Sequence, residues 1–403
     1  SITAMDAAGF HSQAVVVPVV LDILAPSVVS TNPVNNGVFN VTIASITFNL
    51  TDAFTAVDPS ATFNGAAVKN ALGQDISGTW ATSGSGQLVV ITFEPASVLS
   101  EGVYTAVINP TDILGNRGSY TLAFTVDATP PPAPGFNPVS SPTRNTSILL
   151  TGSKTSDSVS VAVTGTNLSI GAVSYPSATT WSVTVSGLKE GANSISAYAK
   201  DPAGNQSGSA STTVVLDTIP PSAPTANALT SPTKNTSVTL SGAKEAGSYL
   251  FVNGTKTLVD FSTASWSYAA NLSEGNNTFT LYTKDEAGNQ SQSLSVSIIR
   301  DTTPPVISSS TPTINAFTNQ AGTIDIVLSD SFSSIDLQAS LNNAVVKNSS
   351  GSVVSGQWSV VGGKLVFTPS AALTDSVYTV TLYPVDGLGN IGAVSFSFTL
   401  DAA

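Results

Sequence analysis

The chain has 403 residues, enough for several domains with separate cores, and only 9% of them are charged. A net charge of −12 with 13 scattered Lys and Arg residues argues against nucleic-acid binding, which needs clustered basic side chains. The sequence has no cysteine and no run of about 18 apolar residues, which excludes disulfides and a membrane-spanning helix.

The first segment, residues 1–22, predicts a hairpin. Met5-Asp-Ala-Ala-Gly-Phe10 has the composition of a turn. The apolar run Ala14–Leu24 predicts a strand rather than a signal peptide, because it contains Pro18 and Asp22 and lacks a charged leader. A lone hairpin cannot bury its apolar face. We therefore expect this segment to be the tail of a preceding domain, or else to pair with another molecule.

Four longer units follow, and an Asp that shortly precedes Pro marks where each begins. These residues are Asp22, Asp127, Asp217 and Asp301, and Asp401 closes the last unit. The units are 105, 90, 84 and 100 residues long, close to the roughly 100 residues of an immunoglobulin-type sandwich. We therefore expect four domains, at residues 23–127, 128–217, 218–301 and 302–403.

Within each unit, an Asp-x-x-Gly-Asn motif predicts a tight turn between the last two strands, F and G. Gly and Asn tolerate positive φ, as such turns require. Residues 194–199 and 278–283 alternate before the turn, and residues 293–298 alternate after it, as half-buried strands do. The motifs are Asp112-Ile-Leu-Gly-Asn116, Asp201-Pro-Ala-Gly-Asn205, Asp285-Glu-Ala-Gly-Asn289 and Asp386-Gly-Leu-Gly-Asn390.

Other recurring residues divide the units into two subtypes. Tyr104 and Tyr378 each lie eight residues before the turn Asp, where immunoglobulin-type sandwiches have a tyrosine corner. The two middle units have Asn193 and Asn277 there instead. Each unit also has one tryptophan, which we interpret as a core anchor rather than as a sugar-stacking platform: Trp80, Trp181, Trp266 and Trp358.

With these motifs, the chain resembles the bacterial Ig-like repeats of large secreted adhesins and biofilm proteins. The middle units carry the similarity, in Asp217-Thr-Ile-Pro-Pro-Ser-Ala-Pro224, Thr230-Ser-Pro-Thr-Lys-Asn-Thr236 and the turn that begins at Asp285. The first and fourth units are more similar to Ig-like modules of surface-layer and cell-wall proteins. The resemblance implies export, tandem arrays and calcium at domain junctions. We expect an all-β fold of four tandem immunoglobulin-like β-sandwich domains in an elongated array, preceded by an F–G hairpin of another domain.

The acidic residues gather at the pole where each expected domain begins. The incoming linker, the B–C loop and the F–G turn of such a sandwich all lie at that pole, so acids distant in sequence should meet there. By junction, the candidate ligands are Asp22, Asp52, Asp58 and Asp112; Asp127, Asp157 and Asp201; Asp217, Glu245 and Asp285; and Asp301, Asp330, Asp336 and Asp386.

We expect these acids to bind a divalent metal, because converging carboxylates repel one another unless a cation neutralises them. A hard cation with roughly six to eight oxygen ligands fits sites that have no sulfur and no imidazole, and calcium suits flexible loops better than magnesium. The alternative is that Asp serves only the turns, since its side chain hydrogen-bonds its own backbone. A shared coordination sphere of Asp127, Asp157 and Asp201 would be the decisive observation.

The function that we infer is a non-catalytic, extracellular stalk of a bacterial surface adhesin, stiffened by calcium and projecting a binding module. One alternative is a self-assembling surface-layer or filament subunit, in which the hairpin of one chain completes its neighbour. Another is a polysaccharide-binding module of a cell-wall protein, with aromatics such as Tyr175, Tyr249 or Phe261 contacting sugar. The expected partners are calcium, further Ig-like repeats and a surface receptor or a second copy of the chain.

An enzyme is disfavoured by the residue inventory. His11 is the only histidine and lies in the hairpin, so a complete domain offers neither a Ser-His-Asp nor a Cys-His arrangement. Paired carboxylates can cleave glycosides, but here they recur at every linker, which suits architecture better than one active site. No Gly-rich phosphate-binding loop is present.

Overall fold

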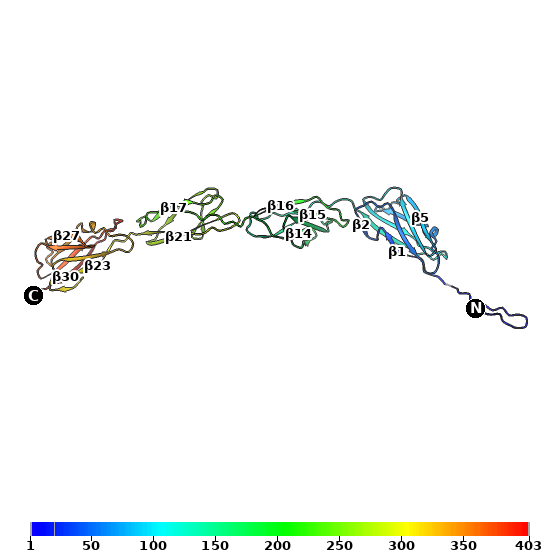
Figure 1. Ribbon diagram of the computed structural model, residues 1–403, viewed down its shortest axis with the longest axis horizontal. Coiled ribbons are helices and arrows are strands. Elements are labelled where there is room, and N and C mark those ends of the chain that lie inside the picture. The colour runs from blue at the N-terminus through cyan, green and yellow to red at the C-terminus, as the bar shows by residue number, and fades with distance from the viewer. Residues whose placement is uncertain (1, 20, 402–403) are drawn as a thin grey trace. The chain divides into compact units, whose positions relative to one another are not determined.

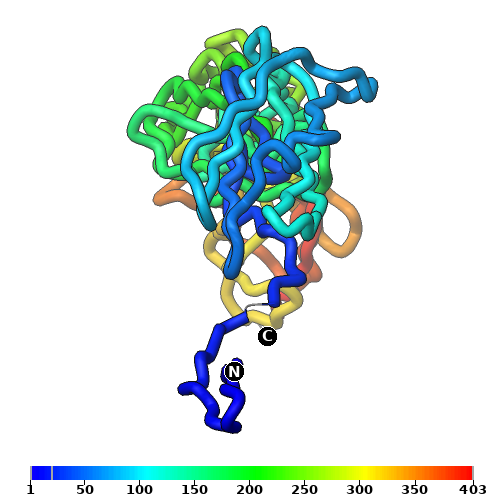
Figure 2. Tube along the Cα trace, turned by 90° about the vertical axis from the view of Figure 1, so that its right-hand side faces the viewer, coloured from blue at the N-terminus to red at the C-terminus, as the bar shows by residue number. Residues whose placement is uncertain are grey.

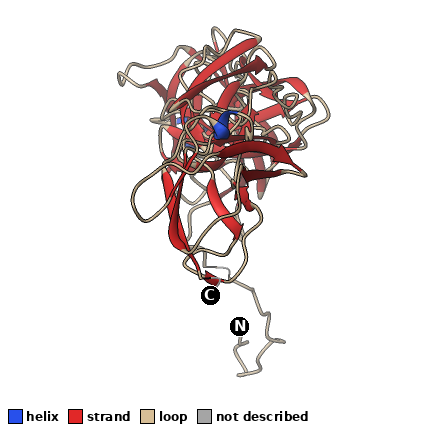
Figure 3. Ribbon diagram, turned by 90° about the vertical axis from the view of Figure 1, so that its left-hand side faces the viewer, coloured by secondary structure: helices blue, strands red, loops and turns tan. Residues whose placement is uncertain are grey.

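The computed structural model describes residues 2–19 and 21–401 of the chain, and nearly all of its regular structure is β-strand (Figure 3). Two compact units make up the chain, residues 1–141 with 145–216 and residues 142–144 with 217–403. The expected all-β, immunoglobulin-like fold is confirmed, since the strands form paired, mostly antiparallel sheets around separate apolar cores. Among the described residues, no helix is long and apolar enough to cross a membrane.

The N-terminal segment is a hairpin with little regular pairing, shown in dark blue in Figure 2. Single bridges join Ile2 to Val15 and Met5 to His11, and the carboxylate of Asp6 accepts the amide hydrogens of the turn. The strand expected at Ala14–Leu24 is not formed in the described part of that run, so this prediction is wrong. Its apolar side chains have no apolar layer to pack against and are exposed, which removes the burial that stabilises a strand.

The first sandwich has two four-stranded sheets, which Figure 1 shows with β1, β2 and β5 labelled. One sheet has the order β1 (Ser27–Asn32), β3 (Ile46–Thr51), β6 (Leu88–Pro95) and β5 (Gly78–Ser85). The other has β2 (Gly37–Phe39), β8 (Tyr120–Val126), β7 (Gly102–Ile108) and β4 (Ala67–Asn70), and a short helix, α1 (Pro59–Phe63), precedes β4. Alternation fixes the inner face, because Ile46, Phe48 and Leu50 of β3 are buried while the residues between them are half-buried.

The second sandwich has a five-stranded and a three-stranded sheet. The larger sheet follows the order β12 (Ser169–Ile170), β14 (Thr180–Ser186), β10 (Ser147–Ser153) and β9 (Gly135–Phe136), and β13 (Ser174–Ser177) also pairs with β14. The smaller sheet contains β11 (Ser160–Gly165), β15 (Gly191–Lys200) and β16 (Ala210–Leu216). Strands β15 and β16 are the F and G strands, and β15 contains the run 194–199 that the alternation predicted.

The third sandwich has the smallest first sheet, with only β17 (Ser237–Ala243) and β20 (Ser265–Asn271). Its second sheet has the order β19 (Thr255–Lys256), β18 (Tyr249–Val252), β21 (Gly275–Lys284) and β22 (Leu294–Arg300). The predicted alternating runs 278–283 and 293–298 lie largely within β21 and β22, which pair with each other.

The fourth sandwich repeats the strand plan of the first. One sheet has the order β23 (Val306–Thr311), β25 (Ile324–Ser329), β28 (Lys364–Pro369) and β27 (Gly356–Val361). The other has β24 (Phe317–Thr318), β30 (Val394–Leu400), β29 (Ser376–Leu382) and β26 (Val345–Lys347), and a 3-10 helix, η1 (Ala339–Leu341), precedes β26. The outer domains, one of the two subtypes inferred from the sequence, therefore share one strand plan, whereas the two middle domains differ in their edge strands.

The turn before strand F is fixed by a side chain in every domain. The Tyr378 hydroxyl donates to the Thr374 carbonyl at 2.7 Å and accepts from the Thr374 amide at 3.0 Å, which confirms a tyrosine corner. Asn193 makes the same pair of contacts in the second domain, to the carbonyl and amide of Lys189. The amide side chain thus replaces the phenol in the middle domains.

The tryptophans lie against the cores. Trp181 and Trp266 are buried, and their indole N–H groups donate to backbone carbonyls. Trp80 and Trp358 are only partly buried and pack on the edge of their cores. The core-anchor interpretation is therefore confirmed for the two middle domains and holds in part for the outer two.

Candidate metal centres

The first domain brings three acids together from distant parts of the sequence. Asp22 lies in the incoming linker, Asp52 directly follows β3, and Asp112 opens the F–G turn. All three are buried, and one carboxylate oxygen of each lies within 4.8 Å of the others. At such distances each pair of charges repels by about 3 kcal/mol or more with an effective dielectric constant of about 20. The three carboxylates are close enough together that they could hold a cation.

A hydroxyl group sits at the centre of these acids. The Thr55 Oγ1 atom is 2.9 Å from a carboxylate oxygen of Asp22, 3.0 Å from one of Asp112 and 3.4 Å from one of Asp52. A hydroxyl carries one hydrogen, so it satisfies one of these three acceptors at a time. The Asp52 oxygen also accepts from the amides of Phe54 and Thr55, and the Asp112 oxygen also accepts from the side-chain amide of Asn116.

The F–G turn holds its Asp in place through short hydrogen bonds. The Asp112 Oδ1 atom accepts from the amides of Leu114 at 2.9 Å and Asn116 at 2.8 Å, and Gly115 takes the positive φ of 90° that the turn needs. Burial alone would raise the pKa of Asp112, but hydrogen bonds from Asn116, Thr55 and Leu114 outweigh it and lower the pKa. The carboxylate is therefore ionised at neutral pH.

The fourth domain repeats the group with Asp301, Asp330 and Asp386, again with one oxygen of each within 4.8 Å of the others. Ser333 takes the place of Thr55, and its Oγ atom lies 2.9 Å from Asp386 and 3.3 Å from Asp330. Burial raises the pKa of Asp386, and hydrogen bonds from Asn390, Ser333 and Leu388 lower it further than burial raises it.

One oxygen of the fourth-domain group has no partner. Asp301 is 0% exposed, and its Oδ1 atom accepts from the amide and hydroxyl of Thr303. Its Oδ2 atom is buried and has no hydrogen-bond partner among the described residues. A buried anionic oxygen without a donor or a cation is costly, by several kcal/mol.

The second and third domains do not form such a group. Within residues 2–19 and 21–401, the only groups of three or more acidic ligands are the two above. Asp201 is buried and Asp127 half-buried, but Asp157 is exposed, so the coordination sphere expected from these three is not assembled. In the third domain Asp217 and Asp285 are half-buried, and Glu245 is exposed and accepts from the linker amide of Ser222 at 2.8 Å.

A lysine takes the B–C position in these two domains. Lys244 directly follows β17, is 5% exposed, and donates to the carbonyls of Thr263 at 2.6 Å, Ser248 at 2.9 Å and Phe261 at 3.1 Å. Burial lowers the pKa of its ammonium group, and the charge of Asp260 partly opposes this. Lys154 directly follows β10 and donates to the carbonyls of Ser158 and Ala178.

Two further candidate ligands bond to the first residues of helices. Asp58 is the N-cap of α1, and its carboxylate accepts from the Ala61 amide at 3.0 Å. Asp336 accepts from the Ala339 amide at 2.8 Å at the start of η1. Neither belongs to a three-acid group: Asp58 caps α1, and Asp336 bonds to the first turn of η1, which the B–C loop assignment did not anticipate.

The turn Asn is the residue whose role the sequence did not reveal. In each domain its Nδ2 atom donates to the backbone carbonyl of the linker Asp and to the carboxylate of the turn Asp. The carbonyl contacts join Asn116 to Asp22 at 3.2 Å, Asn205 to Asp127 at 2.6 Å, Asn289 to Asp217 at 2.8 Å and Asn390 to Asp301 at 3.1 Å. The sequence does hint at this role, because the Asn lies four residues after the turn Asp in every repeat.

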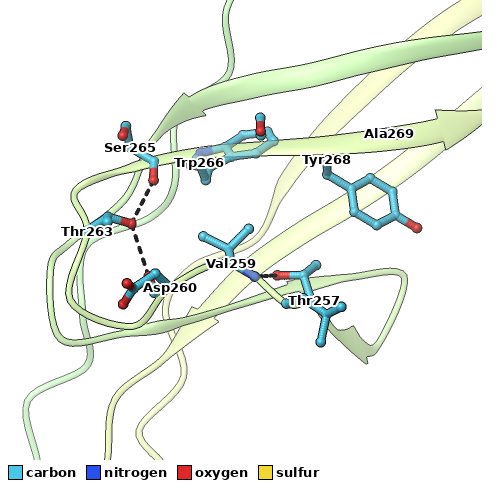
Figure 4. A pocket seen from close by; sticks show the side chains of 10 residues that line it. Thr257, Val259, Asp260, Thr263, Ser265, Trp266, Tyr268 and Ala269 are labelled. Atoms are coloured by element: carbon cyan, nitrogen blue, oxygen red, sulfur yellow. Dashed lines mark hydrogen bonds between the residues drawn. The ribbon is translucent and has the colours of Figure 1, made fainter.

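The third domain also has an open groove of about 620 Å³ beside β20, shown in Figure 4. Asp260, Thr263 and Ser265 lie toward one end, where the Thr263 hydroxyl bonds to the carbonyls of both neighbours, and Tyr268 lies toward the other end. The aromatic residues that were proposed to contact sugar make other contacts. The ring centroids of Tyr249 and Phe261 are 4.5 Å apart, and the Tyr175 hydroxyl accepts a hydrogen bond from the Val161 amide.

Comparison with known proteins identifies the domain type. Residues 135–218 match one model described as a bacterial Ig-like domain, and residues 301–400 match another with the same description. Domains of this kind are typically non-catalytic. No curated protein matches the sequence.

Several solved structures are similar to the chain. A tetra-tandem repeat from the extending region of a large adhesion protein is 17% identical, with a TM-score of 0.27, over 91% of this chain and 97% of that one. An I-band fragment of titin is 11% identical, with a TM-score of 0.30, over 70% of this chain and 100% of that one. Fibronectin(III)-like modules of CbhA from Clostridium thermocellum are 16% identical, with a TM-score of 0.28, over 47% of this chain and 93% of that one. At these values the similarity says nothing about function. The two matching segments nevertheless show that this chain carries bacterial Ig-like repeats.

Proposed function

We propose that the chain is a non-catalytic, extracellular stalk of a bacterial surface adhesin, that Ca²⁺ at its domain junctions stiffens it, and that it projects a binding module from the cell. The observation that supports this most directly is the recurring bond from the turn Asn to the linker Asp carbonyl. A hydrogen bond that recurs at every junction restricts the conformation of the linker that enters each domain.

The linkers that enter the second and fourth domains are bonded at both ends. Where the fourth domain begins, the Thr302 amide donates to Glu274 of the preceding E–F turn at 2.9 Å, and the Asp301 carbonyl accepts from Asn390 of the following domain. In the same way, the Ala128 amide donates to Glu101 at 2.8 Å. Pro304 and Pro305 follow at once and fix further φ angles. Few free torsions are left, as a stalk requires.

A bound cation would add to these ties. The linker Asp, the B–C loop Asp and the F–G Asp of a three-acid group belong to three different segments, so one ion would join all three. The oxygens of these groups are carboxylate and hydroxyl oxygens, which suit Ca²⁺. Extracellular modules bind Ca²⁺ with dissociation constants on the order of 10⁻⁴ to 10⁻³ M, so millimolar calcium would fill such sites.

Small-angle scattering of the full chain tests the proposal. We expect a longer maximum dimension and a narrower distance distribution in millimolar CaCl₂ than after chelation, with ionic strength held constant. Asp301→Asn should reduce the difference, and the exposed Asp75→Asn should leave it unchanged. A distance distribution that does not respond to calcium would refute the stiffening.

A polysaccharide-binding role is the second candidate, and the groove beside β20 favours it. Tyr268 offers an aromatic ring, and Asp260 and Ser265 offer polar groups that could orient a sugar (Figure 4). A glycan array probed with the full chain and with Tyr268→Ala would separate the two functions, since a stalk binds no glycan specifically. Light scattering over a range of concentrations tests the third candidate, a self-assembling subunit.

A further inference from the structure

The four domains differ at one structurally equivalent position, the residue that directly follows strand B, which is β3, β10, β17 or β25 in the four domains. Its backbone amide donates to the carbonyl just before the neighbouring strand: Asp52 to Gln87, Lys154 to Thr179 and Lys244 to Ala264. In the fourth domain Asp330 directly follows β25. The position is therefore acidic in the outer domains and basic in the middle ones.

The lysines cannot serve as cation ligands, and they do not turn toward the acids of their own junctions. The Lys244 ammonium group lies among three carbonyl oxygens at 2.6 to 3.1 Å, and the Glu245 carbonyl is 3.4 Å away. The middle domains have thus lost the third carboxylate and have gained a positive charge that is already satisfied by the backbone. A second cation nearby would meet repulsion and fewer oxygens.

In the fourth domain, by contrast, one carboxylate oxygen of Asp301 has no hydrogen-bond partner among the described residues. This Oδ2 atom is buried, and the Asp301 carboxyl group faces those of Asp330 and Asp386 within 4.8 Å. The Ser333 hydroxyl adds a fourth oxygen to the same place. This unpartnered oxygen points to a bound cation more directly than the clustering of acids does.

We propose that the chain binds two divalent cations, one in the fourth domain at Asp301, Asp330 and Asp386 and one in the first domain, where Asp22, Asp52 and Asp112 form the equivalent three-acid group and Thr55 donates to Asp22. The middle domains bind none at the equivalent place. This inference rests on the proposed function and narrows it: calcium controls the linkers that enter the first and fourth domains, and the linkers that enter the middle domains are insensitive to calcium.

The test is the stoichiometry of calcium binding to the full chain. The protein is stripped of metal with a chelator, dialysed, and titrated with CaCl₂ by isothermal titration calorimetry, with native mass spectrometry as an independent count. We expect two ions per chain for the wild type and one for either Asp330→Asn or Asp386→Asn. The matched control, Asp285→Asn at the F–G turn of the third domain, should still bind two.

Each result decides a different question. Four ions in the wild type, or two that persist in both Asp330→Asn and Asp386→Asn, would overturn this inference and leave the proposed stalk standing. No binding at millimolar calcium would overturn the calcium part of the proposed function as well. Because the wild-type count alone separates two from four, the test does not depend on any variant folding.

Discussion

The Nδ2 atom of Asn390 donates a hydrogen bond to the backbone carbonyl of Asp301, 89 positions earlier in the chain, at 3.1 Å. The same Nδ2 atom bonds to the carboxylate of Asp386 at 2.6 Å. One amide group therefore connects the linker to the F–G turn of the domain that the linker enters. This connection recurs in all four domains and has consequences that experiments can measure.

Replacing Asn390 by alanine should destabilise the fourth domain. The variant loses one bond to a carbonyl and one to a carboxylate, and it leaves the buried Asp386 with fewer donors, for a loss of roughly 2–3 kcal/mol in free energy of unfolding. Differential scanning calorimetry of the full chain should show one transition moved to lower temperature. The control is Asn342→Ala, an exposed residue of the same domain. Equal melting of the two variants would contradict the role given to Asn390.

Removing the hydroxyl from the tyrosine corner should lower the free energy of unfolding by less than Asn390→Ala does. In Tyr378→Phe the ring remains stacked on Phe398 at 5.4 Å, so only the bonds to Thr374 are lost, at about 1 kcal/mol. The matched change at a more exposed position is Tyr383→Phe. Chemical denaturation monitored by fluorescence gives the free energy of unfolding of both variants. A decrease for Tyr383→Phe as large as that for Tyr378→Phe would argue against a stabilising role of the tyrosine corner.

Replacing Lys244 by methionine should destabilise the third domain. Methionine keeps the length of the side chain but leaves several carbonyls near a buried position without a donor, which costs roughly 1–3 kcal/mol. Hydrogen exchange at β17 and β20 should become faster. Lys189→Met, at an exposed position of the second domain, is the control, and unchanged exchange in Lys244→Met would show that the carbonyls find water instead.

Calcium should raise the stability of the outer domains selectively. At 10 mM free Ca²⁺ and a dissociation constant on the order of 10⁻⁴ to 10⁻³ M, binding to the folded state adds about 1.4–2.7 kcal/mol per site. Calorimetry with CaCl₂ and with a chelator should shift the transitions that Asp386→Asn and Asp112→Asn affect. A uniform shift of every transition would indicate a general salt effect instead.

The candidate site shows how far sequence reasoning reaches. The linker Asp, the B–C acids and the F–G turn were assigned to one pole of each sandwich from motif spacing, and in the outer domains Asp22 meets Asp112 and Asp301 meets Asp386 there. The same reasoning treated all four junctions alike. It took Asp157 and Glu245 as ligands because they follow strand B at the right distance, and it overlooked Lys154 and Lys244 beside them.

By itself, the sequence determined the fold class, the turns and the pole at which the acids gather, because alternation, Gly-containing turns and repeat spacing are visible in the chain itself. Only the tertiary structure decided which carboxylates meet. A shared coordination site depends on ångström distances and on the direction of each side chain, and spacing in the sequence specifies neither. That is why Asp58 caps a helix, Lys244 turns to the backbone, and Asp301 keeps one oxygen buried without a partner.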